Sequence, residues 1–180
     1  EALALSGAKC VKYISCRDYV RLIKSPQLYS FALRHGCNIL FNALEMQKKC
    51  EEMFPGNEDK LFTAYNIIDC EKAREDAKEE LDEEYKKFYD THRVIAFSSR
   101  FVEQKCQWDM LKSFELLKKD IPDAGLIFLG CRGEYENAVR EMAKKSEYSN
   151  DIVFAGFQKN VFKFVSRADV FAMTSHYEGF

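Results

Sequence analysis

The sequence predicts an α/β fold in which short parallel strands alternate with helices. The second half contains four short apolar segments separated by three segments of helical periodicity, at 93–98, 107–119, 126–129, 134–145, 152–154, 160–167 and 170–173. A helix between two strands brings the chain back to the end of the sheet where the first strand began, so the two strands run parallel. We therefore expect a Rossmann-like unit in this half.

The first half shows a similar alternation in shorter pieces. Ser25 followed by Pro26 predicts the start of a helix, and Gly36 predicts its end in a left-handed conformation. The segments that follow predict a strand over 38–41, a helix over 44–53 and a strand over 60–65.

The acidic run 71–90 predicts a helix that connects two domains. Its apolar residues, spaced by three or four positions, form one narrow seam: Ala73, Ala77, Leu81, Tyr85 and Phe88. We accordingly divide the chain into a domain over 1–70, a connecting helix over 71–91 and a second domain over 92–180.

Composition excludes several classes of protein. With 47% hydrophobic and 31% charged residues the chain has a globular composition, and its net charge of −2 disfavours a nucleic-acid partner. No apolar stretch approaches the roughly 20 residues that cross a bilayer. The 7 cysteines form no Cys-x-x-Cys pair, so we expect reduced thiols and a cytoplasmic protein.

Charge is distributed unevenly along the chain. Residues 1–40 carry six basic and two acidic side chains, whereas residues 41–90 carry eight basic and fifteen acidic ones. The basic residues of 9–34 alternate with tyrosines. They are interpreted as a solvated helix face. The alternative is that they contact anionic lipid, peripherally at the inner membrane face, or a polyanionic acceptor.

Ligands of parallel sheets bind outside the carboxyl ends of the strands, where several polar residues fall here. Arg100 and Lys105 follow the first strand of the second half, near the start of a helix, and are candidates for binding a diphosphate. The alternative is that both are solvated loop cations. Gly130 follows the next strand, where it lets the backbone come close to a ligand or simply makes a turn, which is more common for an isolated glycine.

The last strand is followed by residues 174–179, TSHYEG. The carboxylate of Glu178 could accept hydrogen bonds from a polyhydroxylated ligand, because sugars offer several donors. An ordinary surface glutamate is the alternative. His176 is a loop histidine or, two residues from Glu178, a group that acts on a proton.

These segments resemble the glycosyl transferases group 1 family, retaining enzymes of GT-B fold. Residues 97–105, FSSRFVEQK, are similar to the family element G-R-L-x-x-x-K-G, and residues 127–130 to its next strand and glycine. Residues 153–180 resemble its v-x-F-x-G, a-D-v-f-v and S-x-x-E-G-F series. Upstream, residues 65–69, YNIID, resemble its x-N-G-x-D segment less closely.

The resemblance implies that Arg100 and Lys105 neutralise the donor diphosphate and that Glu178 contacts the donor sugar as a catalytic residue. It places further donor-site residues in the loops: Ser99, Gly130, Ser175, His176 and Gly179. Ser99 and Cys106 stand where the family has glycine. A second family glutamate would lie beyond Phe180, so we expect a fragment with the end of an acceptor domain and most of a donor domain, inactive alone.

The predicted function is transfer of a hexose from a nucleotide diphosphate sugar to an acceptor hydroxyl with retention. The acceptor would be a carbohydrate or lipid-linked. Preorganised cations would stabilise the leaving diphosphate, and no Asp-x-Asp motif is present, so we expect no metal and no other cofactor. The alternatives are a non-catalytic nucleotide-binding module and a nucleotide-sugar epimerase or phosphorylase of the same architecture. A dehydrogenase is disfavoured because no Gly-x-Gly-x-x-Gly follows a strand.

Overall fold

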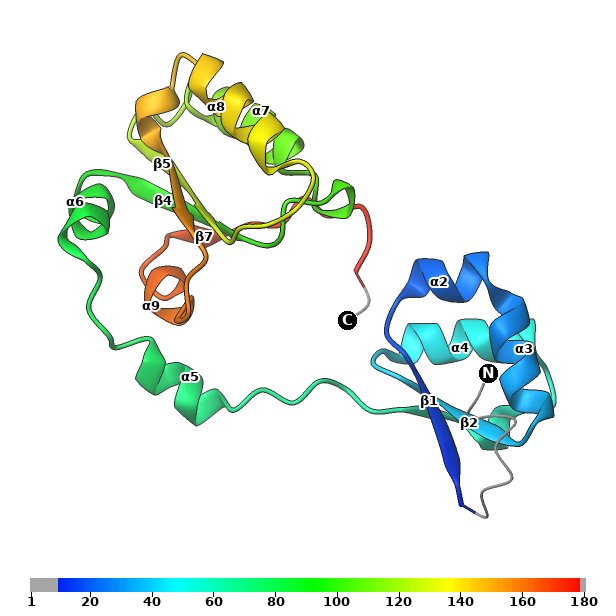
Figure 1. The fold of residues 1–180 in the computed structure, drawn as a ribbon. Helices are drawn as coiled ribbons and strands as arrows, with labels where there is room; N and C mark the ends of the chain where they lie inside the picture. The colour runs from blue at the N-terminus through cyan, green and yellow to red at the C-terminus, as the bar shows by residue number, and fades with distance from the viewer. Residues whose placement is uncertain (1–9, 179–180) are drawn as a thin grey trace. The chain divides into compact units, whose positions relative to one another are not determined.

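Two parallel sheets organise the protein, one in each half of the chain (Figure 1). The computed structural model describes residues 10–178. Contacts between residues divide the chain into two units, the first ending at Ile67 and the second spanning Ile68–Tyr177. All strand pairs are parallel, so the predicted α/β class is confirmed.

Unit 1 contains a three-stranded sheet in the order β1-β2-β3. Its elements are β1 (Lys12–Cys16), α2 (Tyr19–Lys24), α3 (Pro26–Arg34), β2 (Cys37–Phe41), α4 (Leu44–Met53), the 3₁₀ turn η1 (Glu58–Lys60) and β3 (Leu61–Thr63). The helices predicted around Ser25–Gly36 and over 44–53 are both present. Gly36 has φ +72°, the left-handed conformation expected after the end of a helix.

The core of unit 1 forms between one face of the sheet and its helices. Ile39, Phe41 and Leu61 alternate with more exposed residues along β2 and β3, as a strand with one buried face requires. Leu22 of α2, Leu33 of α3 and Met46 of α4 pack against them.

The basic stretch corrects one expectation. Residues 12–16 form β1, the edge strand of the unit 1 sheet, and only Tyr19–Lys24 and Pro26–Arg34 are helical. The interpretation as one solvated helix face is therefore wrong for the strand. The exposed residues Tyr13 and Ser15 alternate along β1 with the less exposed Lys12, Ile14 and Cys16, which is the pattern of a strand. Lys9 lies outside the described residues, and membrane contact stays a prediction.

Unit 2 contains a four-stranded sheet in the order β6-β5-β4-β7. Its strands and helices are α5 (Cys70–Asp76), α6 (Glu83–Thr91), β4 (Arg93–Ser98), α7 (Gln107–Leu117), β5 (Ala124–Leu129), α8 (Glu136–Lys145), β6 (Ile152–Gly156), α9 (Phe162–Val165) and β7 (Val170–Phe171), with 3₁₀ turns η2 (Glu103–Lys105) and η3 (Ser149–Asp151). All four predicted strands and all three predicted helices of this half are present.

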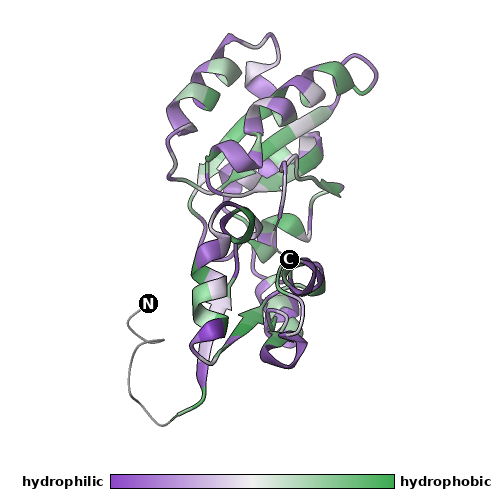
Figure 2. Ribbon diagram, turned by 90° about the vertical axis from the view of Figure 1, so that its right-hand side faces the viewer, coloured by the Kyte–Doolittle hydropathy of each residue, from purple (hydrophilic) through white to green (hydrophobic). Residues whose placement is uncertain are grey.

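Helices cover both faces of this sheet (Figure 1). Phe97 and Phe128 point toward α7 and α8, whereas Ala96 and Ile127 point toward α6 and α9. Every residue of the central strand β5 is buried, as expected for a parallel strand covered on both sides. The helices mix hydrophilic and hydrophobic residues along their length (Figure 2), since each has one buried face.

The predicted connecting helix is two helices. α5 ends at Asp76 and α6 begins at Glu83. In a continuous helix the carbonyls of this segment would accept hydrogen bonds from the helix itself. Here two of them accept from side chains of α9 and the residues after it: Lys163 Nζ donates to Glu80 O at 3.3 Å and Arg167 to Ala77 O at 3.1 Å. Leu81, within the break, is buried against Phe164. Tertiary contacts therefore interrupt the helix that the acidic seam predicted.

All seven cysteines are free thiols. Cys16, Cys37, Cys50 and Cys106 are buried. No helix within residues 10–178 combines the length and the apolar character that a membrane crossing requires.

Candidate functional site

The loop after β4 carries the first candidate residues and is fixed by a buried amide. Ser99 is half-buried and Arg100 is exposed. Gln107, the first residue of α7, has no exposed surface, and its Nε2 donates to Ser99 Oγ at 2.8 Å and to Arg100 O at 2.6 Å. Sequence reasoning missed Gln107, because an amide in a first helical turn carries no signal of this contact.

Gly130 makes a close approach to the neighbouring backbone, and its approach to a ligand stays a prediction. It has φ +125°, and a Cβ added there would lie 2.2 Å from Ser99 O. Its N–H donates to Gly156 O at 2.6 Å, while Ser99 N donates to Leu129 O at 3.0 Å. Because Gly130 has no side chain, the loop after β5 packs directly against the backbone of the loop after β4.

The residues after Gly130 extend this contact. Phe101 N donates to Arg132 O at 3.1 Å, and Tyr135 N donates to Phe101 O at 3.2 Å. A Cβ at Gly133 would lie 1.9 Å from Phe101 O, with φ +144°. A second glycine three residues after the first is a signal in the sequence for this close packing, and it was not among the predicted site residues.

These loops enclose a cavity of about 190 Å³ at the carboxyl ends of β4, β5 and β6. Ser99, Arg100 and Gly130 line it together with Phe157 and Gln158. The structure thus brings three of the sequence-predicted residues to one cavity. Among residues 10–178 the Arg100 guanidinium forms no ion pair, so its charge is available to an anion.

Lys105 does not line this cavity but belongs to a loop tied to the end of unit 2. The hydroxyl of Thr174 donates to Lys105 O at 3.2 Å and to Cys106 O at 2.8 Å. His176 N donates to Gln104 O at 2.9 Å, and Gln104 Nε2 donates to Tyr177 O at 2.6 Å. The residues after β7 therefore run along the Lys105 loop.

The remaining candidates lie on the segment after β7. The Oγ of Ser175 is buried and has no hydrogen-bond partner within the described chain. His176 is exposed and joins the loop through its backbone only. Glu178 is exposed and directly follows Tyr177, at which unit 2 ends, so its approach to Arg100 and Lys105 stays a prediction. Gly179 lies outside the described residues.

The two departures from the family's glycines have different consequences. Cys106 has φ 49° and ψ 47°, the left-handed conformation that glycine adopts most easily, and its thiol is buried. Burial raises the pKa of the Cys106 thiol, which stays protonated. Ser99 has no positive φ. Its side chain accepts the Gln107 bond, so serine fits this position without backbone strain.

Metal ligands do not gather in the described part of the chain: no group of three or more His, Cys, Asp or Glu side chains is placed to hold an ion. The absence of a metal requirement stays a prediction. What the site offers chemically is a cavity lined by the Arg100 guanidinium, which forms no ion pair within residues 10–178, and a guanidinium is suited to phosphate oxygens.

A family comparison agrees with this geometry. The model of the family described as glycosyl transferases group 1 matches residues 78–180, more than half of the chain. The chain belongs to the glycosyl transferases group 1 family. The match covers the Arg100 loop, the Gly130 loop and the segment after β7, which are the parts that form the candidate site.

Two curated relatives are glycosyltransferases. The chain is 29% identical over 151 residues to an uncharacterised glycosyltransferase of Methanocaldococcus jannaschii, covering 84% of this chain and 37% of that protein. It is 33% identical over 94 residues to a GDP-mannose-dependent monoacylated alpha-(1-6)-phosphatidylinositol monomannoside mannosyltransferase of Corynebacterium glutamicum, covering 51% and 24%. The chain thus spans well under half the length of both relatives.

Solved structures share the fold at low identity. HepE of Anabaena, crystallised with UDP and glucose, superposes with a TM-score of 0.73 at 15% identity, covering 93% of this chain and 47% of that one. TarM superposes with a TM-score of 0.74 at 15% identity, covering 98% and 34%. The predicted GT-B type of fold is confirmed.

Proposed function

We propose that the chain is the donor-binding part, with the end of the acceptor part, of a retaining glycosyltransferase. The enzyme transfers a hexose from a nucleotide diphosphate sugar to an acceptor hydroxyl. The observation that carries this proposal is the cavity at the carboxyl ends of β4, β5 and β6. There Arg100, which has no ion pair within residues 10–178, lies beside the close contact of Gly130 and Ser99.

The chemistry assigns Arg100 to the diphosphate. Negative charge builds on the leaving diphosphate as the glycosidic bond breaks, and a preorganised cation in a cavity lowers that barrier. The Gln107 bonds hold the backbone of the Arg100 loop before any ligand arrives, so little ordering is needed on binding. Lys105 is the second cation, and Glu178 is assigned to the sugar. Charge stabilisation by these side chains supports a metal-independent reaction.

Nucleotide titration tests this proposal. The Anabaena neighbour was crystallised with UDP and the Corynebacterium relative is named for GDP-mannose, so UDP and GDP are the first ligands, with ADP as a third. We expect one of them to bind and Arg100→Ala to weaken it about tenfold or more, because a hydrogen bond to a charged group contributes about 1.5–3 kcal/mol.

Lys119→Ala is the matched control. Lys119 is an exposed cation just after the end of α7, and α7 begins beside the cavity at Gln107. Its removal changes the net charge by the same amount and is expected to leave affinity unchanged. Equal losses in both variants, or binding unaffected by Arg100→Ala, contradict the assignment.

A further inference from the structure

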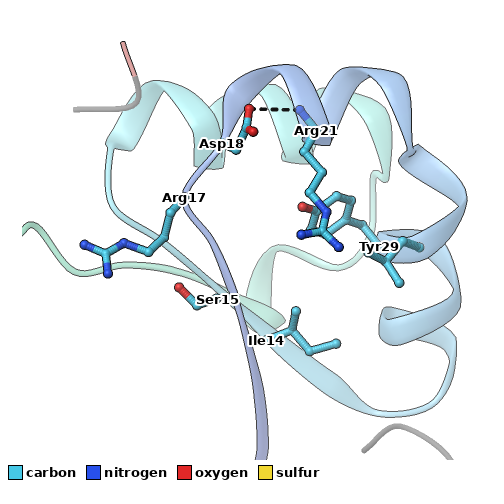
Figure 3. Close-up of a pocket in the computed structure, with 7 residues that line it drawn as sticks. Ile14, Ser15, Arg17, Asp18, Arg21 and Tyr29 are labelled. Atoms are coloured by element: carbon cyan, nitrogen blue, oxygen red, sulfur yellow. Dashed lines mark hydrogen bonds between the residues drawn. The ribbon is translucent and has the colours of Figure 1, made fainter. Parts of the chain in front are cut away.

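Unit 1 has a cavity of its own at the carboxyl end of its sheet. It measures about 440 Å³, within the range of small-molecule sites, and lies where β1 leads into α2 and α3. Arg17, Arg21 and Tyr29 are among its lining residues (Figure 3). Both arginines come from the basic stretch that sequence analysis left without a definite role.

The positive charge in this cavity is not neutralised by an ion pair. Within the described chain neither Arg17 nor Arg21 forms one, and Arg17 instead donates to Asn66 Oδ1 at 2.6 Å. Asp18 is nearby, but its carboxylate accepts the backbone N–H of Arg21 at 3.1 Å. In Figure 3 the Asp18 carboxylate and the Arg21 guanidinium extend in different directions from α2, the guanidinium toward Tyr29.

Tyr29 adds a neutral donor beside Arg21. Its ring is buried, and its hydroxyl oxygen accepts the Cys16 thiol at 3.1 Å. The phenol proton is therefore left for an acceptor in the cavity. Burial raises the pKa of Tyr29, which keeps this proton in place at neutral pH.

A second cavity of about 180 Å³ adjoins the first and shares Ser15 and Arg17 with it. It continues across the ends of β2 and β3, where Asn42 and Asn66 line it. Asn42 is buried, and its Oδ1 has no hydrogen-bond partner in the described chain. A buried amide oxygen without a partner is unfavourable, and a ligand hydroxyl in this cavity could satisfy it.

We propose that the paired cavities of unit 1 bind a phosphate ester of a polyhydroxylated acceptor, with the phosphate at Arg21 and Tyr29 and hydroxyls toward Ser15, Arg17 and Asn42. This inference rests on the proposed transfer to an acceptor and names its chemical class. A carboxylate is satisfied by one bidentate guanidinium, whereas a phosphate has enough oxygens for the Arg21 guanidinium and the Tyr29 phenol together.

Calorimetric titration of the chain with glucose 6-phosphate and with glucose tests the proposal for a soluble ester. Vesicles of phosphatidylcholine, with and without phosphatidylinositol, test a lipid headgroup. We expect glucose 6-phosphate or vesicles that contain phosphatidylinositol to bind, whereas glucose and vesicles of phosphatidylcholine alone, which carry no net charge, should not bind. Arg17→Gln and Arg21→Gln should each weaken binding about tenfold. Both side chains are exposed, so the variants are expected to keep the melting temperature of the wild type.

Two control variants distinguish binding at this site from a general effect of charge and from binding at the donor site. Arg34→Gln removes an exposed charge from α3 that lines neither cavity, and it should not change binding. Arg100→Ala should also leave binding of these probes unchanged, although it weakens nucleotide binding. The proposal is overturned if no probe binds, if Arg34→Gln has the same effect as the other two, or if only Arg100→Ala reduces binding. UDP titration reports separately on the proposed donor site.

Discussion

The hydroxyl of Thr174 donates to the carbonyl oxygens of both Lys105 and Cys106, at 3.2 and 2.8 Å, across 69 and 68 positions of sequence. The Thr174 side chain, which follows strand β7, thus holds the loop that carries Lys105, a candidate for binding the diphosphate. The hydrogen bonds of Gln104 with His176 and Tyr177 continue this contact. A substitution in the Lys105 loop is therefore expected to change the conformation of the segment after β7, and the reverse.

Thr174→Val removes the hydroxyl while keeping the shape of the side chain. We expect the free energy of unfolding to fall by about 1–2 kcal/mol, because the carbonyls of Lys105 and Cys106 each lose a donor, although Cys106 O keeps the N–H groups of Asp109 and Met110. Urea denaturation measures the change. Thr91→Val, which removes a hydroxyl bonded within its own helix at 2.9 Å, should cost less than half as much. Equal costs would show that the bridge contributes nothing specific.

Gln107→Leu tests whether the buried amide positions Arg100. Both bonds of Nε2 are lost, and no charge is removed. We expect affinity for the bound nucleotide to fall about fivefold, equivalent to about 1 kcal/mol. Gln47→Leu is the control, because it removes bonds to Glu51 and Thr63 in unit 1. Unchanged nucleotide affinity in a folded Gln107→Leu variant would argue against positioning.

The left-handed backbone at Cys106 predicts that substitution by glycine and by valine will change the stability of the fold by different amounts. A left-handed conformation costs a non-glycine residue about 1–2 kcal/mol, so Cys106→Gly relieves strain that offsets the lost packing of the thiol. We expect its stability to stay within about 1 kcal/mol of the wild type. Cys106→Val should lose about 2 kcal/mol or more, because branching at Cβ is poorly tolerated there. Chemical denaturation distinguishes them, and a stable valine variant would contradict the strain argument.

A partly buried ion pair at the amino-terminal end of the unit 2 sheet predicts a pH dependence of stability. Asp151 contacts Lys118 Nζ at 2.7 Å and His92 Nε2 at 3.1 Å, and Lys118 is almost fully buried. Burial alone would raise the pKa of Asp151, but the bonds to Lys118 and His92 outweigh it and lower the pKa. The charged carboxylate therefore stabilises the fold above the unfolded pKa of about 3.9.

Asp151→Asn should lower the free energy of unfolding by about 2–3 kcal/mol at neutral pH, because it leaves a buried ammonium without its counter-charge. The difference from the wild type should shrink as pH falls below about 4, where the wild-type carboxylate also becomes protonated. Asp123→Asn breaks the exposed pair with Arg93 and should lower the free energy of unfolding by much less, because water screens exposed charges. A pH-independent effect of Asp151→Asn would refute the electrostatic explanation.

Much of unit 2 could be predicted because its signals are local. Apolar runs such as 93–98 become buried strands, and residues directly after a strand in a parallel sheet meet at one edge. This rule found Arg100 and Gly130, which line one cavity. It did not find Gln107, whose role depends on a tertiary contact that no periodicity records.

The errors in the remaining elements have tertiary causes. Strand β1 carries polar residues on its exposed positions, so its short pattern was hidden in a basic stretch. The break between α5 and α6 depends on Lys163 and Arg167, which lie more than 80 positions away. The same limitation hid the role of Arg17 and Arg21, since only the fold of unit 1 brings them to one cavity.

Mapping UDP binding by amide chemical shifts on the isotopically labelled chain tests the assignment of the donor site most directly. We predict that added UDP perturbs the amides of 99–101 and 130–133, which surround the cavity after β4 and β5, and that Arg100→Ala reduces these shifts at equal UDP concentration. Perturbations confined to other residues, or the same pattern and affinity in Arg100→Ala, would contradict the assignment.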